Sequence, residues 1–163
     1  MIPVQKKLDG FLLVLSTSNI DEGLVGYGTK YDCSSGDINV IGGLNKVLVQ
    51  KILAYLLETY PKLTAIKDIL NAKPSAELVP VRTGHTAQTD EEDMGLTYKQ
   101  IKEFNDLRNL ELCGIVSTFQ ALCEMYPDQD PQLIKSKCET FFARYFMNRH
   151  KSTISTPGPH LTS

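Results

Sequence analysis

The stretch FLLVLSTSNIDEGLVGY, residues 11–27, decides the fold class of this chain. Its first part, FLLVLS, is a continuous apolar run, which is typical of a strand buried on both faces of a parallel sheet. The polar residues that follow predict a short helix, for which Ser18 or Asn19 is the N-cap. A strand that leads into a helix places backbone N–H groups at the strand's carboxyl end, where α/β proteins bind ligands.

The composition is that of a globular chain of one-domain size. The 163 residues are 42% hydrophobic and 22% charged, which suffices for a core. The formal net charge of -2 gives no long-range attraction to nucleic acid or anionic lipid. The longest apolar run, Phe11 to Leu15, is far shorter than the about 20 residues that span a bilayer. We therefore expect a soluble chain without a nucleic-acid or membrane partner.

The cysteines carry no metal or disulfide signature. No CxxC pair occurs and no signal-like segment precedes them, so neither a zinc site nor a disulfide framework is indicated. We expect reduced thiols in the cytoplasm for all four of them: Cys33, Cys113, Cys123 and Cys138.

Helical periodicity accounts for most of the remaining pattern. It predicts a helix over residues 45–60, ended by Pro61, and a shorter one over 62–70. Thr97 begins a further helix with Gln100 in the capping-box position. Asp130 followed by a proline begins the last helix. Its apolar stripe is expected to form core or a subunit interface and consists of Leu133, Ile134, Cys138, Phe141, Phe142, Tyr145 and Phe146.

Two segments lack periodicity. Residues 71–96 hold two prolines, two glycines and an acidic cluster, which predicts a long structureless loop of the kind that is usually functional. Within it QTDEEDMG, residues 88–95, reads either as a mobile acidic lid or as a solvated charge run. The Ser/Thr/Pro-rich tail, residues 152–163, is expected to be frayed and disordered, which leaves residues 1–151 as the domain.

One strand and about five helices make an incomplete α/β fold. A lone buried strand has no ladder partners for its backbone groups. The pattern therefore predicts that the rest of the sheet comes from absent sequence or from another chain.

The loop YDCSSGDINVIGGLNK, residues 31–46, is the first candidate for a ligand pocket. Hydroxyl groups near a strand's end suit phosphate or ribose, a glutamate suits Mg²⁺ shared with phosphate oxygens, and lysines neutralise phosphate charge. Gly42 and Gly43 allow close approach ahead of a helix, although no Walker pattern is present. The alternative is a solvated surface loop. The side chains concerned are Thr17, Glu22, Lys30, Asp32, Asp37 and Lys46.

A second candidate is NRHK, residues 148–151, which offers an imidazole and two further cations. Such residues are equally expected at a helix C-terminus because they complement the helix dipole. No Ser/His/Asp or Cys/His arrangement for covalent catalysis emerges.

Four segments taken in order resemble the synthetase domain of eukaryotic glutamine-dependent NAD synthetase. They are LLVLSTSNIDEGLVGYGTKYDCSSGDINVIGGLNK, PSAEL, TDEEDMGLTY and FFARYFMNRHK, and the likeness runs from about Phe11 to Lys151. The resemblance implies an α/β, three-layer, parallel-sheet fold of the adenine nucleotide alpha hydrolase-like, N-type ATP pyrophosphatase kind, helix-rich in this part. It also implies a two-step reaction. ATP adenylates deamido-NAD with release of pyrophosphate, and ammonia then displaces AMP to give NAD.

The resemblance also implies roles for residues that match the motifs. Thr17 and Ser75 should contact ATP, Lys46 should meet the ATP phosphates as the catalytic cation, and Glu22 should hold Mg²⁺. Two of the expected substrate residues, Asp90 and Glu91, should come from a loop that closes over the site. The full set expected to bind deamido-NAD is Lys30, Asp37, Asp90, Glu91, His150 and Lys151.

The chain also departs from this pattern. The family's phosphate loop, S-G-G-x-D-S, and its glutaminase domain have no counterpart in the sequence. Smaller departures are Ser16 for Gly, Gly28 for Leu, Gly36 for Ala and Val40 for Pro. The added glycines are expected to loosen the loop by about 0.5–1 kcal/mol each.

Three readings stay open at this point. The first is the C-terminal half of an NAD synthetase domain, which would need ammonia from a glutaminase domain elsewhere. The second is a non-catalytic truncated paralogue that binds nucleotide or assembles with a full-length synthetase, and the third is a generic nucleotide-binding module. Because the strand and the aromatic stripe lack partners, we expect homo-oligomers, association with the missing part of the enzyme, or poor solubility.

Overall fold

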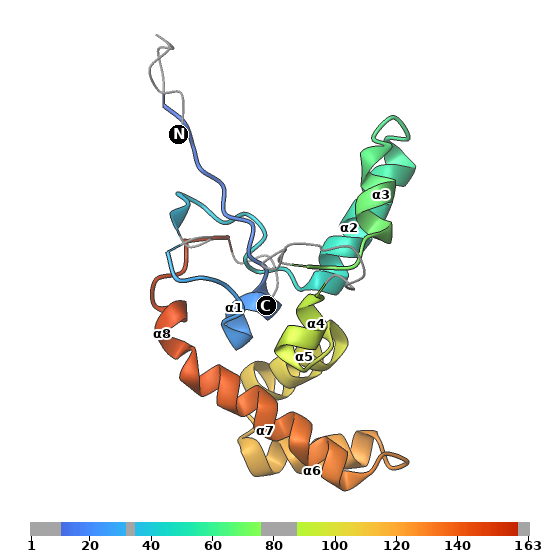
Figure 1. The fold of residues 1–163 in the computed structure, drawn as a ribbon, viewed down its shortest axis with the longest axis vertical. Coiled ribbons are helices and arrows are strands. Elements are labelled where there is room, and N and C mark those ends of the chain that lie inside the picture. The colour runs from blue at the N-terminus through green and yellow to red at the C-terminus, as the bar shows by residue number, and fades with distance from the viewer. Residues whose placement is uncertain (1–10, 32–34, 76–87, 160–163) are drawn as a thin grey trace.

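The computed structural model describes residues 11–31, 35–75 and 88–159 (Figure 1). Their regular structure is helical, and the β pairing found among them is an isolated parallel bridge between Leu15 and Ile38. None of the helices in these ranges combines the length and apolar character that a membrane span needs.

A packed helical body forms one end of the molecule (Figure 1). Its long element is α7 (Pro131–Met147), which packs against α6 (Ile115–Met125) and α1 (Ile20–Val25). Beside them lie α5 (Tyr98–Asn105) and the π-helical turn η2 (Asp106–Leu110). One buried cluster joins these elements and includes Leu24, Val25, Met94, Leu96, Ile101, Phe104, Leu122, Ile134, Phe141 and Tyr145.

Helix α7 confirms its predicted start and most of its predicted core. Asp130 caps it by accepting from the Gln132 N–H, and Pro131 occupies the first turn. The stripe is core for Ile134, Cys138, Phe141, Phe142 and Tyr145. Its other two members, Leu133 and Phe146, are exposed and so are not part of this core, and the alternative of a subunit interface stays a prediction for them.

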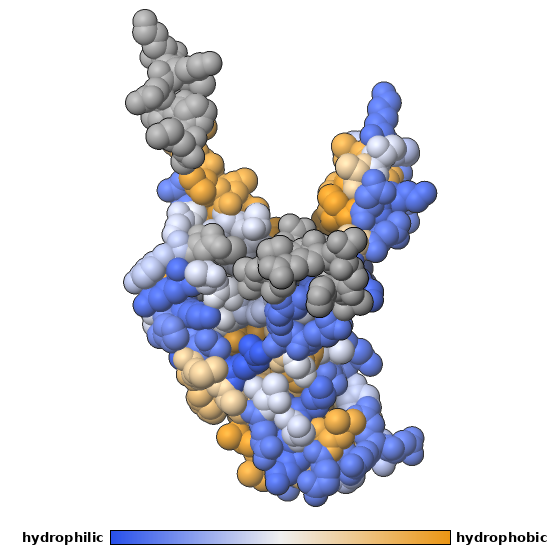
Figure 2. Space-filling model, in the orientation of Figure 1, coloured by the Kyte–Doolittle hydropathy of each residue, from blue (hydrophilic) through white to orange (hydrophobic). Residues whose placement is uncertain are grey.

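Helices α2 (Lys46–Thr59) and α3 (Ala65–Asn71) pack on each other and project away from this body (Figure 1). Asn45 caps α2 by accepting from the Leu48 N–H, so the element forms as the sequence predicts. No described residue covers its apolar face (Figure 2), however, and neither helix contains a fully buried residue.

The predicted buried strand at residues 11–16 is wrong for the described part of the chain. The segment is extended, and its Val14 carbonyl accepts from the Asp37 N–H at 2.8 Å while its Ser16 N–H donates to the Ile38 carbonyl at 2.9 Å. Residues 11–15 are nevertheless exposed. With no further strand alongside and no helix over its faces among the described residues, the run has nothing to be buried against.

The predicted structureless loop over 71–96 is also corrected in part. Residues 90–94 form α4 (Asp90–Met94), begun by a capping box between Thr89 and Glu92 and ended by Gly95 at φ +69°. The structure does not describe residues 76–87, so the prediction for them lies outside it.

Two further helices were not predicted. Helix α6 begins at Gly114, which has no capping side chain and therefore leaves no N-cap signal in the sequence. The short α8 (Arg149–Ser152) follows α7 directly. Beyond it, the Pro157 carbonyl accepts from the Asn39 N–H at 2.8 Å, so this part of the tail lies against the loop that precedes α2.

Candidate functional site

Helix α1 is short, and a capping box fixes its start. The Asn19 side chain accepts from the Glu22 N–H at 3.0 Å, and the Glu22 carboxylate accepts from the Asn19 backbone N–H at 3.2 Å and from its Nδ2 at 2.7 Å. The helix ends at Gly26, whose φ of +63° is the left-handed conformation that glycine adopts without strain. Because both ends are fixed, Asp21 and Glu22 hold defined positions.

Asp21 joins α1 to the start of α2. Its side chain is buried, and its Oδ2 accepts from the Lys46 backbone N–H at 2.7 Å. Its Oδ1 has no hydrogen-bond partner among the described residues. Burial raises the pKa of this carboxyl to about 6, and the Lys46 hydrogen bond opposes the shift. Asp21 thereby fixes where the Lys46 side chain begins.

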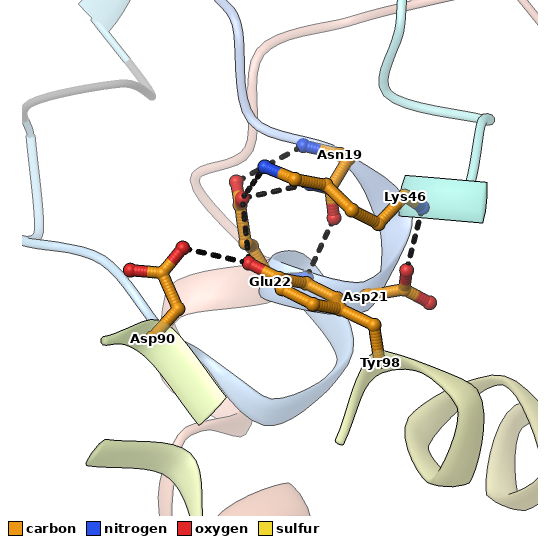
Figure 3. A network of polar contacts seen from close by, with 6 residues as sticks. All are labelled: Asn19, Asp21, Glu22, Lys46, Asp90 and Tyr98. Atoms are coloured by element: carbon orange, nitrogen blue, oxygen red, sulfur yellow. Dashed lines mark hydrogen bonds and ion pairs between the residues drawn. The ribbon is translucent and has the colours of Figure 1, made fainter. Parts of the chain in front are cut away.

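The Lys46 ammonium lies between an acid and an aromatic ring (Figure 3). Its Nζ is 3.9 Å from Glu22 Oε1 and 5.2 Å from the centroid of the Tyr98 ring. Burial raises the pKa of Glu22, while Asn19 and the nearby ammonium lower it and Asp90 raises it again. The contact is loose and partly exposed, so the ammonium is free to turn towards an anionic ligand.

Tyr98 connects α5 to this group and to α4 (Figure 3). Its hydroxyl donates to Asp90 Oδ2 at 2.9 Å and lies 3.5 Å from Glu22 Oε1, and its backbone N–H donates to Glu91 Oε1 at 2.8 Å. Burial, together with the bond to Asp90, raises the pKa of the phenol above its usual range. Asp90 is itself buried, and no group in the described part of the chain bonds to its Oδ1.

The site thus gathers three carboxylates: Glu22 pairs with the Lys46 ammonium, Asp21 accepts from the Lys46 backbone N–H, and Asp90 accepts from the Tyr98 hydroxyl. Within the described ranges no three metal-ligating side chains are grouped so as to hold an ion by themselves. Mg²⁺ commonly takes one or two protein carboxylates and completes its shell with substrate phosphates and water. The donor set therefore fits Mg²⁺ only when it is shared with a phosphate ligand.

Glu22 also lines a small pocket of about 60 Å³, and Lys30 and Lys151 are among the other residues of its wall. The Lys151 Nζ donates to the carbonyls of Gly26 and Gly28, each at 2.8 Å, which fixes it beside the end of α1. The Lys30 Nζ lies 4.9 Å from the centroid of the ring of Tyr31. Two lysines from segments far apart in the sequence therefore line one pocket together with Glu22.

A larger pocket of about 330 Å³ adjoins it, and Ser18, Gly23 and Ser155 line both. The glycine pair from the sequence, Gly42 and Gly43, forms part of its wall. Asn39 and Arg149 also line this pocket, together with apolar residues such as Ile20 and Leu24.

The remaining predicted site residues lie outside the network of Figure 3 and outside the lining of these two pockets. Thr17 and His150 are exposed, and the exposed Asp37 accepts from the Val14 N–H at 2.8 Å. Ser75 follows Pro74, whose carbonyl accepts from the Asp90 N–H at 3.1 Å. Ser75 therefore lies near the start of α4.

The structure brings Glu22, Lys46 and Asp90 together, with Glu91 bonded to the same tyrosine. Sequence reasoning missed Asp21 and Tyr98. The motif TDEEDMGLTY ends on Tyr98, but no spacing rule distinguishes a phenol that bridges acids from one that fills a core.

One departure from the family pattern is explained by close packing. A Cβ on Gly36 would lie 2.5 Å from Ser16 Oγ and 2.9 Å from the Ser16 backbone nitrogen. It would also lie 3.1 Å from the Val14 carbonyl oxygen, so two of the atoms it meets are backbone. The lack of a side chain at Gly36 therefore allows the loop to lie close to the 11–16 segment.

Solved structures share this fold. A glutamine-dependent NAD(+) synthetase from Cytophaga hutchinsonii matches with a TM-score of 0.63 at 21% identity, over 90% of this chain and 21% of that one. An NMN synthetase from Francisella tularensis matches with a TM-score of 0.56 at 27% identity, over 86% of this chain and 44% of that one. The fold class is therefore that of the NAD synthetase structures, which agrees with the α/β expectation, although the described part of this chain is helical.

The NAD synthase family model matches residues 6–154, and the chain belongs to that family. The glutamine-dependent NAD(+) synthetase of Saccharomyces cerevisiae is 46% identical over 152 residues, which is 93% of this chain and 21% of the yeast protein. The bovine synthetase is 44% identical over 155 residues, which is 94% of this chain and 22% of the bovine protein. The chain thus spans about a fifth of the length of these curated relatives.

Proposed function

We propose that this chain forms the Mg²⁺- and phosphate-binding part of an NAD synthetase, a carbon–nitrogen ligase. The reaction would be ATP-dependent amidation of deamido-NAD to NAD through an adenylated intermediate, with release of AMP and pyrophosphate. The observation that carries this proposal is the meeting of Glu22, Lys46 and Asp90 around Tyr98, at the carboxyl end of the 11–16 segment.

In this proposal Lys46 is the catalytic cation that contacts the ATP phosphates. Its partly exposed ion pair gives it the freedom to turn towards them, while the Asp21 contact holds the base of its side chain. Glu22 would hold Mg²⁺, with the unpartnered oxygen of Asp90 nearby. A bound Mg²⁺ would neutralise charge that develops on the phosphates. Thr17 and Ser75 would contact ATP from the two flanking segments.

Deamido-NAD would occupy the two pockets described above, of which Glu22 lines the smaller. Lys30 and Lys151 supply positive charge there for its phosphates. Further contacts from Asp37 and His150 would require the ligand to reach beyond the pocket lining. Asp90 and Glu91 would contact it from α4.

The nitrogen source is also a proposal. The relatives named above are called glutamine-dependent, and we propose that ammonia from a glutaminase domain outside this sequence displaces AMP. A cytoplasmic location and a homo-oligomeric state remain predictions.

A chimera tests the proposed function. The region of the yeast synthetase that matches this chain is replaced by this chain, and NAD formation is followed with ATP, Mg²⁺, deamido-NAD and ammonium. We expect turnover by the chimera and a loss of at least about 100-fold in Lys46→Ala and Glu22→Gln, since each removes a contact to charge in the transition state. Lys135→Ala, which changes an exposed lysine on α7, is the matched control and should retain activity.

A non-catalytic family member is the second candidate. The substitutions within the matched motifs, such as Gly28 and Gly36, favour it. A folded chimera with no turnover, in which Lys46→Ala changes nothing, would support this alternative over catalysis.

A further inference from the structure

Tyr98 meets four charged side chains, each through a different part of the residue (Figure 3). Its hydroxyl donates to Asp90 Oδ2 at 2.9 Å and lies 3.5 Å from Glu22 Oε1. The centroid of its ring is 5.2 Å from the Lys46 Nζ. Its backbone N–H donates to Glu91 Oε1 at 2.8 Å. One uncharged residue therefore contacts acids from α1 and α4 and the lysine that begins α2.

The Tyr98 hydroxyl is close to two carboxylates, and it serves Asp90 more than Glu22. It has one proton, and the shorter distance, 2.9 Å against 3.5 Å, assigns that proton to Asp90. Glu22 also accepts from the Asn19 backbone N–H and Nδ2, so it keeps donors without the phenol. Asp90 is buried, and within the described ranges nothing bonds to its Oδ1. A buried carboxylate that loses a donor turns towards another donor or towards water, so the hydroxyl fixes where Asp90 points.

Tyr98 is itself held in place. It is the first residue of α5, directly after the N-cap Thr97. The Thr97 hydroxyl accepts from the Gln100 N–H at 3.2 Å, and the Gln100 Oε1 accepts from the Thr97 N–H at 3.0 Å. The side chain is buried and belongs to the same core cluster as Ile101 and Phe104. A side chain that is fixed by a cap and by core packing can hold a neighbouring charged group at a defined position.

Helix α4 is also held by contacts other than the Tyr98 hydroxyl. The Tyr27 hydroxyl donates to Asp93 Oδ2 at 2.9 Å. The Lys137 Nζ donates at 2.8 Å to the carbonyl of Gly95, which ends the helix. Removal of the Tyr98 hydroxyl should therefore leave α4 in place and change only the direction of the carboxylate that it bonds.

We propose that Tyr98 is a positioning residue for the reaction, and that its hydroxyl holds the Asp90 carboxylate beside Glu22 and Lys46 so that a phosphate ligand meets these charges at a fixed spacing. This role rests on the proposed function and adds to it a residue that touches no reacting atom. Charged groups that are already in place when the ligand binds stabilise it more than groups that must first rearrange. The phenol transfers no proton in this role, because it acts only by holding Asp90.

The test uses Tyr98→Phe in the chimera, since phenylalanine keeps the ring and removes only the hydroxyl. Two quantities are measured: kcat/KM for NAD formation, and the calorimetric affinity for Mg²⁺ with a non-hydrolysable ATP analogue. We expect the first to fall at least about 10-fold and the second at least about 3-fold, because misplaced charges bind phosphate less well. Tyr126→Phe is the matched control, because it also removes a hydroxyl that donates to a carboxylate, that of Glu103. It should change either quantity by less than about two-fold, since this pair lies outside the charged network.

A double variant shows whether the hydroxyl acts through Asp90. Once Asp90→Ala has removed the carboxylate, the hydroxyl has nothing left to hold. Tyr98→Phe added to Asp90→Ala should therefore lower the analogue affinity by less than about two-fold further. A purely structural loss at Tyr98 would instead multiply with that of Asp90→Ala.

Each outcome decides the proposal. A selective loss in Tyr98→Phe that disappears in the Asp90→Ala background, with an unchanged unfolding temperature, supports it. No loss in Tyr98→Phe, an equal loss in Tyr126→Phe, multiplied losses in the double variant, or a Tyr98→Phe chimera that does not fold overturns it. A chimera that binds the analogue but makes no NAD counts against the proposed function alone, and the affinities then decide the role of Tyr98. A chimera that does neither overturns both.

Discussion

Phe141 and Phe11 both lie in apolar runs, yet one side chain is buried and the other is exposed. Phe141 is fully buried on α7, with its ring stacked on Phe104 at 4.4 Å between centroids. Phe11 is 89% exposed at the start of the extended segment. The helical body supplies neighbours for its apolar residues, whereas segment 11–15 has no covering layer among the described residues. The comparison teaches that an apolar pattern specifies an element, and that burial depends on what lies beside it.

The largest expected effect separates these two phenylalanines. Phe141→Ala should lower the free energy of unfolding by about 3–5 kcal/mol, because it removes a buried ring and leaves a cavity. Phe11→Ala should change it by less than about 0.5 kcal/mol, because an exposed ring leaves no cavity. Urea unfolding followed by circular dichroism measures both. Equal losses would mean that segment 11–15 is packed in solution and that the contrast between the regions fails.

The next effect concerns α1, which joins the body to the extended segment. Gly26→Ala should cost about 2–3 kcal/mol, because φ is +63° and the new Cβ would lie 2.2 Å from Asn148 Cβ. Gly23→Ala is the matched control in the same helix, where a Cβ meets nothing within 4 Å. It should gain about 0.5–1 kcal/mol from helix propensity. Thermal unfolding of both variants checks the pair, and a neutral Gly26→Ala would show that α1 is not held against the end of α7.

Asp21 gives an intermediate, pH-dependent effect. Its pKa rises from 3.8 to about 6 on folding, so the folded state binds the proton more tightly than the unfolded state. This contribution to stability is complete below about pH 4 and is lost as the pH rises to about 6, by about 2–3 kcal/mol at most. Asp21→Asn should remove that slope and raise stability at pH 7 by about 1–2 kcal/mol. Unfolding free energies measured from pH 4 to 7 test it, and an unchanged slope would refute the assignment.

Lys46 should give the smallest effect on stability. Its pair with Glu22 spans 3.9 Å and both side chains keep some exposure, so Lys46→Met should cost less than about 1 kcal/mol. The same substitution should lower the turnover of the chimera by at least about 100-fold. Urea unfolding of the chain measures the stability change, and the NAD-formation assay of the chimera measures the change in turnover. A stability loss as large as that of Phe141→Ala would mean that Lys46 belongs to the core.

Local signals in the sequence were sufficient to predict where several helices begin. Asn19, Thr97 and Asp130 each cap the helix that the sequence assigned to them, because an N-cap bond depends only on residues two or three positions apart. The same kind of signal was present but overlooked at Thr89 and Glu92, where a capping box begins α4. At Gly114 no such signal exists, and α6 was missed.

The candidate site was predictable in part. Glu22, Lys46 and Asp90 were chosen from motifs, and the structure places them in one network. Asp21 and Tyr98 complete it, but their importance comes from contacts across α1, α2 and α5, which no local spacing encodes. The roles of Glu22, Lys46 and Asp90 in binding Mg²⁺, ATP and deamido-NAD remain predictions for the chimera to test.

The sequence by itself determined the caps, the helical stripes and the family of this protein, since these depend on neighbouring residues and on motif order. Only the tertiary structure decided which apolar residues are buried and which acid pairs with the Lys46 ammonium. The physical reason is that burial and electrostatics depend on neighbours in space. The run at residues 11–15 has the composition of a buried strand and lies exposed, because the described residues offer it one short parallel contact and no covering layer.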